Sequence, residues 1–140
     1  MLELIREAIA ANQAEASTYS QAVRVWMRVM SVAFLASVVF APWKAGARWI
    51  LIAMLINIAG LVFVKVAMPE LTRTTIGTTV HLLFWTLALF MIWRPGARET
   101  RRDDFSGATG RLYQVWLVLA SLIMATSLVL DARTAIGWLV

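Results

Sequence analysis

Long apolar runs, interrupted by short polar stretches, are the dominant pattern along this chain. Four such runs predict membrane-spanning helices, over residues 24–42, 49–68, 76–93 and 111–130. A hydrocarbon core of ~30 Å takes roughly 20 helical residues, so each run is long enough to cross it. None of the runs alternates between polar and apolar residues, as a barrel strand would. The pattern therefore predicts an all-α fold, an integral membrane four-helix bundle.

Prolines and tryptophans mark where these runs end. Pro42, Pro69 and Pro95 follow the first three runs, and proline cannot continue a hydrogen-bonded helix. Most of the tryptophans lie near the ends of the runs, where an indole ring is stable at the level of the lipid headgroups. Trp85 is the exception, because it lies in the middle of the third run.

The segment that precedes the first run has a different pattern. Leu2, Ile5 and Ile9 recur at helical spacing with charged residues between them, which predicts an amphipathic helix. This helix either lies along the membrane surface or extends the first membrane helix. Thr18 and Gln21 have the spacing of a capping box, so Thr18 is predicted to begin the first membrane helix.

Composition supports a single membrane domain over residues 1–140. Hydrophobic residues make up 61% of the chain and charged residues 15%, against about 45–50% and about 25% in soluble domains. Cysteine is absent, which excludes disulfides and thiolate metal sites. The chain has 1 histidine, whereas haem in a helical bundle usually takes two axial ligands. We therefore expect no cofactor and no metal.

The net charge of +5 changes this picture little. Most of the basic residues lie at or near the ends of the apolar runs, as membrane anchoring requires, so we expect no nucleic-acid partner. The stretch RPGARETRRDD favours a cytoplasmic loop with both termini outside, although basic residues nearly balance on the two sides. Arg98, Arg101 and Arg102 in this loop are candidate contacts for anionic lipid headgroups, and the alternative is a solvated loop that sets topology. We expect a multi-pass protein of the cell inner membrane.

Polar residues inside the runs are the candidate chemistry. At 1.5 Å per residue, His81 lies roughly 8 Å below one end of its span, and Ser31 and Ser127 lie at depths of about 10 and 6 Å on the same side. These three residues could therefore form one polar layer across the bundle. Asn57 lies about 16 Å deep, near the midplane, and fits that polar layer less well. Thr78 shares the helix face of His81. The candidate intramembrane polar site comprises His81, Thr78, Ser31, Ser127, Asp131 and Asn57.

Two interpretations of His81 remain open. In the first interpretation, the polar residues around His81 form a pH-sensitive gate or proton-handling site, because histidine changes its charge near neutral pH. In the other, a neutral histidine bonds to a hydroxyl on a neighbouring helix and holds two helices in register. No pairing of a nucleophile with a base forms a recognisable motif, so an enzyme is possible but not indicated.

Small residues indicate assembly. Ala33, Ser37 and Ala41 recur every four positions in the first run, and Ser121 and Ala125 do so in the fourth. Such ridges let helices approach closely, within one chain or between chains. We expect a non-enzymatic accessory, assembly or self-associating subunit of an inner-membrane complex. Its partners would be lipids and either further copies of the chain or a larger membrane complex. The alternative is a small channel or transporter with a pH-sensitive site at His81.

Overall fold

The computed structural model describes residues 1–94 and 107–139, and this part of the chain is built from helices joined by short turns. In chain order the elements are α1 (Leu2–Ser17), α2 (Gln21–Leu35), α3 (Ser37–Phe40), α4 (Ala45–Ala67), α5 (Arg73–Val80), the π-helical turn η1 (His81–Trp85), α6 (Thr86–Trp93) and α7 (Gly107–Gly137).

Four helical units are long and apolar enough to cross a membrane: α2 with α3, α4, α5 through α6, and α7. The predicted all-α fold with four membrane helices is confirmed, and the chain is a multi-pass membrane protein. The helices are longer than the predicted spans. α4 already begins at Ala45 and α5 at Arg73, and α7 continues through Asp131 to Gly137.

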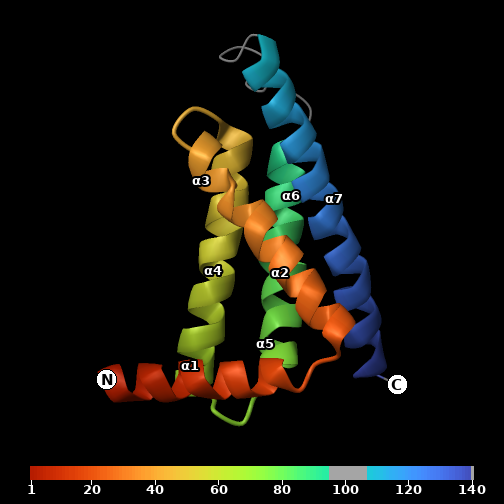
Figure 1. Cartoon of the computed structure of the whole chain (residues 1–140). Coiled ribbons are helices and arrows are strands. Elements are labelled where there is room, and N and C mark those ends of the chain that lie inside the picture. Colours follow the sequence, from red (N-terminus) through yellow and green to blue (C-terminus); the bar gives the residue numbers. More distant parts are fainter. Residues whose placement is uncertain (95–106, 140) are drawn as a thin grey trace.

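α1 is a separate helix that lies across one end of the bundle (Figure 1). The chain turns between α1 and α2, so α1 does not extend the first membrane helix. Thr18 was wrongly predicted to begin that helix: it follows α1 as its C-cap, and its hydroxyl donates to the Glu15 carbonyl at 2.7 Å. Ser20 is the N-cap of α2 instead, because its Oγ lies 3.4 Å from the Val23 N–H and accepts from it.

The four membrane helices converge toward one end and separate toward the other (Figure 1). α1, the last turn of α4 and the first turn of α5 form what we call the α1 end. α3, the start of α4 and the last turn of α6 form the opposite end. α2 crosses obliquely between them, and α4 and α7 lie farther apart at the α1 end (Figure 1).

The apolar core fills the middle of the bundle and the opposite end. It is formed by buried side chains from every membrane helix: Phe34, Phe40, Ala41, Ala47, Ile50, Ala53, Trp85, Ala88, Ile92, Tyr113, Leu117, Ala120 and Met124. Side chains of α7 pack directly on the α4 backbone here, because a Cβ on Gly46 would lie 2.7 Å from the hydroxyl of Tyr113. The α1 end contributes none of these core residues, and polar side chains such as Asn12 and Lys65 are buried there instead.

Candidate functional site

His81 and Asp131 form a hydrogen-bonded pair between the third and fourth membrane helices. Nδ1 of His81, in η1, lies 2.8 Å from Oδ2 of Asp131, in α7. The Thr78 hydroxyl donates to the other carboxylate oxygen at 3.1 Å. Both oxygens of Asp131 are therefore partnered, and the histidine and aspartate side chains are only 14% and 17% exposed. We call Thr78, His81, Trp85 and Asp131 the His81 cluster.

A π-helical turn positions the histidine in this cluster. η1 begins at His81 and ends at Trp85, so the α-helical ladder between α5 and α6 is interrupted at the site. The imidazole stacks on the indole of Trp85, with ring centroids 3.7 Å apart and planes 29° apart. Trp85 is buried, and its N–H has no hydrogen-bond partner in the described part of the chain. Single π-turns inside α-helices frequently occur at functional sites.

Ser127 lies one helical turn before Asp131 but belongs to a different contact. Its hydroxyl accepts from the indole N–H of Trp26 at 3.3 Å and lies 3.1 Å from the sulfur of Met30. Ser127 thereby joins α7 to α2, whereas Asp131 joins α7 to α5 and η1. The two residues together connect α7 to two neighbouring helices.

Ser31 and Asn57 lie apart from the His81 cluster. Ser31 is exposed on α2, and its hydroxyl donates to the carbonyl of Met27 at 2.8 Å. The Asn57 amide oxygen is buried in α4 and has no hydrogen-bond partner among the described residues. The structure thus brings His81, Thr78 and Asp131 together and leaves these two out. The candidate headgroup contacts Arg98, Arg101 and Arg102 lie outside the described residues.

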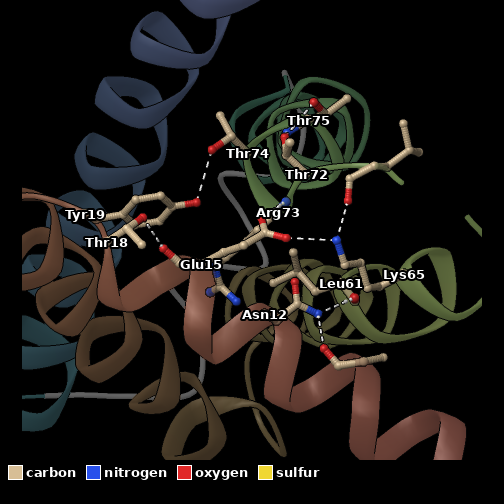
Figure 2. Close-up of polar contacts among 12 residues, drawn as sticks. Asn12, Glu15, Thr18, Tyr19, Leu61, Lys65, Thr72, Arg73, Thr74 and Thr75 are labelled. Atoms are coloured by element: carbon tan, nitrogen blue, oxygen red, sulfur yellow. Dashed lines mark hydrogen bonds and ion pairs between the residues drawn. The ribbon is translucent and has the colours of Figure 1, made fainter. Parts of the chain in front are cut away.

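A second polar network, which we call the α1 anchor, joins α1 to the ends of α4 and α5 (Figure 2). Nζ of Lys65 lies 2.8 Å from the Glu15 carboxylate and donates to the carbonyl of Leu71 at 2.7 Å. The second carboxylate oxygen of Glu15 accepts the backbone N–H of Arg73. One glutamate therefore connects α1 both to the last turn of α4 and to the first residue of α5.

Two further bonds complete the α1 anchor. The Asn12 side-chain amide donates to the carbonyl of Leu61 at 2.7 Å, and the hydroxyls of Tyr19 and Thr74 lie 3.0 Å apart (Figure 2). α1 is thus fixed at several points along its length. The apolar spacing of Leu2, Ile5 and Ile9 predicted a helix here, but no pattern in the sequence indicated which polar side chains would hold it.

The anchor changes the acidity of Glu15. The hydrogen bond from Lys65 lowers the pKa of this carboxyl, partial burial opposes that change, and the backbone N–H of Arg73 adds to the lowering. Glu15 is therefore held in its charged form when α1 is docked. Spacing alone could not have paired Glu15 with Lys65, because 50 positions separate them.

The arrangement of the His81 cluster supports two kinds of chemistry. A carboxylate bonded to an imidazole can take up and release a proton, and the same bonds can hold two helices together. No group of three or more His, Cys, Asp or Glu side chains suited to a metal ion occurs within residues 1–94 and 107–139. Comparison with protein-family models, curated proteins and solved structures gives no match, so the geometry alone carries the functional interpretation.

Proposed function

We propose that this chain is a non-enzymatic accessory or assembly subunit that packs in an inner-membrane complex or with further copies of itself. One observation carries the proposal: an apolar core separates the polar groups at the two ends of the bundle. Phe34 and Trp85 meet edge to face in this core, with centroids 5.1 Å apart, and Met124 is fully buried. A solute path would need polar groups or water through this layer.

The polar side chains on either side of the core are largely engaged in contacts between helices. Thr78 and His81 bond to Asp131 at the α1 end. At the opposite end the indole N–H of Trp93 donates to Ser121 at 3.0 Å, which joins α6 to α7. Polar groups used in this way stabilise helix packing in lipid, where they have no water to bond. In this proposal the His81 cluster keeps α7 in register with the third membrane helix.

The outer surface supports assembly in the membrane. In the most apolar stretch of α4, only 17% of the residues are buried within the chain. The share is the same in the most apolar stretch of the first membrane helix, formed by α2 and α3. The exposed apolar side chains on these helices, such as Val32 and Leu55, face lipid or the helices of another subunit. A small subunit that offers such surfaces, and fixes its own fold by internal polar contacts, is suited to packing between larger membrane proteins.

A second candidate function is a small channel or transporter with a pH-sensitive site at His81. The buried oxygen of Asn57 favours this candidate, because it lies near the middle of α4 without a hydrogen-bond partner in the described chain. An unsatisfied buried amide costs about 1–3 kcal/mol, so water or a substrate at this level would be stabilising. His81 would then control access to that level from the α1 end.

Flux and assembly measurements on the same preparation separate the two candidates. The protein is reconstituted in vesicles that enclose a pH-sensitive dye. His81→Ala is compared with the control Thr79→Ala, whose exposed hydroxyl donates to the Thr75 carbonyl of its own helix. We expect no proton or potassium flux above that of empty vesicles, and a native mass in mild detergent that exceeds one chain. Flux that is lost in His81→Ala and kept in Thr79→Ala would favour the channel or transporter over the accessory subunit.

A further inference from the structure

A groove lies between α1, α2 and the start of α5. Its volume is about 610 Å³, and it is lined by Gln13, Ala16, Ser17, Arg24, Met27, Arg28, Ser31, Val32 and Arg73. Three arginines from two helices therefore surround one space at the α1 end. We propose that this groove binds the headgroup and upper acyl chain of an anionic phospholipid.

The charge of the groove favours a phosphate. Arg24 and Arg28 are exposed on one face of α2, four residues apart. Neither forms an ion pair with a carboxylate in the described part of the chain. Glu15 offsets part of the charge of Arg73, because the two groups interact electrostatically. The guanidinium groups of Arg24 and Arg28 remain available for the bidentate bonds that arginine makes to phosphate.

The groove also changes in polarity along α2, as an amphiphile requires. Arg24 lies close to the start of α2, and Val32 lies eight residues later, about 12 Å deeper along the helix axis. Met27 and Val32 supply apolar surface beyond the arginines, and Val32 is 70% exposed. A phosphate on Arg24 and Arg28 would place an acyl chain along Val32, whereas a free phosphate ion would leave that surface unused.

The position of the groove agrees with a lipid ligand. α1 crosses the end of the bundle, and α2 leaves that end obliquely toward the opposite end (Figure 1). The groove lies between these two helices where the chain enters the membrane, which is the depth of phospholipid headgroups. A lipid bound there would touch both helices and the first residue of α5, so it would brace α1 against the bundle.

Binding of phosphatidylglycerol to the purified full-length protein tests this proposal. Native mass spectrometry in mild detergent gives the affinity for phosphatidylglycerol and for phosphatidylcholine with the same acyl chains. The groove variant is Arg24→Gln with Arg28→Gln. The matched control is Arg48→Gln with Arg111→Gln, which removes the same charge from exposed positions on α4 and α7, near the other end of the bundle.

We expect the groove variant to bind phosphatidylglycerol roughly 10- to 30-fold more weakly than the wild type, and the control variant to change by less than about twofold. Circular dichroism confirms that both variants fold, and Arg24→Lys with Arg28→Lys should bind at an intermediate level.

Three results would overturn the proposal. Equal losses in the groove and control variants would mean that general surface charge attracts the lipid. Binding of phosphatidylcholine as tight as that of phosphatidylglycerol would mean that the arginines do not select an anionic headgroup. Displacement of the lipid by an equal concentration of glycerol phosphate would show that the groove holds a free phosphate group rather than a phospholipid.

Discussion

The two ends of the bundle are held together by different chemistry. At the opposite end the contacts are mainly aromatic. The ring centroid of Phe40 lies 5.2 Å from the centroids of both Tyr113 and Trp116. The Trp116 indole N–H also donates to the Ala33 carbonyl at 2.8 Å. At the α1 end the contacts are hydrogen bonds and ion pairs, as in the pair of Lys65 with Glu15 at 2.8 Å.

This difference determines how each end responds to change. Aromatic contacts depend on shape and do not require a partner of particular charge. A buried carboxylate or imidazole does require one, because an unpaired polar group in a low-dielectric environment is costly. Loss of one side chain at the α1 end therefore leaves a second group unsatisfied, and acid acts directly on the contact. We therefore expect the packing of the α1 end to respond more strongly to substitution and to acid than that of the opposite end.

Removal of the Asp131 carboxylate is expected to have the largest effect. Asp131→Ala leaves both the Thr78 hydroxyl and the His81 ring without their common acceptor. We expect the free energy of unfolding to fall by about 2–4 kcal/mol, measured by titration with dodecyl sulfate in mixed micelles. Asp131→Asn keeps a carbonyl oxygen as acceptor and should lose about half as much.

A double-mutant cycle with His81→Ala tests whether this loss arises from the pair itself. We expect the double variant to be less destabilised than the sum of the single variants by about 0.5–2 kcal/mol. If the losses in the two single variants simply add, His81 and Asp131 do not stabilise the fold as a pair. The α1 end would then not depend on paired polar groups in the way that distinguishes it from the opposite end.

A substitution in the aromatic contacts should have a smaller effect that does not depend on pH. Phe40→Leu keeps an apolar side chain of similar volume but removes the ring contacts with Tyr113 and Trp116. The expected loss is about 1 kcal/mol, equal in mildly acidic and mildly alkaline buffer, by the same titration. A loss that varied with pH over that range would show that ionisable groups also control the opposite end.

Much of the fold was predictable because it follows from local rules. The length of each apolar run, together with Pro42, Pro69 and Pro95, indicates four membrane helices without any knowledge of their packing. Distances along a helix likewise place His81 and Asp131 at the same end of the bundle. Helix ends were less predictable. The first membrane helix starts after Ser20 rather than Thr18, since either residue has a hydroxyl suited to capping.

The pairing of side chains across helices was not predictable from the same rules. Ser127 and Asp131 share a helix face, yet one bonds to Trp26 of α2 and the other to His81 of η1. The π-turn that brings His81 onto Trp85 has no signature in the sequence. The docking of α1 depends on long-range contacts, which only the assembled bundle determines.

The α1 anchor provides the smallest expected effect and the clearest dependence on pH. Glu15→Gln removes the charge that binds Lys65, in a pair whose side chains are 32% and 10% exposed. The expected loss of docking free energy is less than about 1 kcal/mol, because partly exposed ion pairs are weak. It should appear as faster hydrogen exchange in α1, corrected for the intrinsic dependence of exchange on pH, while exchange in α7 stays unchanged.

Acid should reproduce this effect in the wild-type protein. Docking lowers the pKa of Glu15, so the stabilisation is complete above the pKa of a free glutamate and is lost as the pH falls through the lowered value. Exchange in α1 of the wild type should therefore rise on acidification, whereas Glu15→Gln should already be raised at neutral pH and change little further. Glu7→Gln, an exposed change on the same helix, is the control. If Glu7→Gln raised exchange in α1 as much as Glu15→Gln does, the response would arise from the overall charge of α1. Glu15 would then not be the residue that makes the α1 end more sensitive to pH than the opposite end.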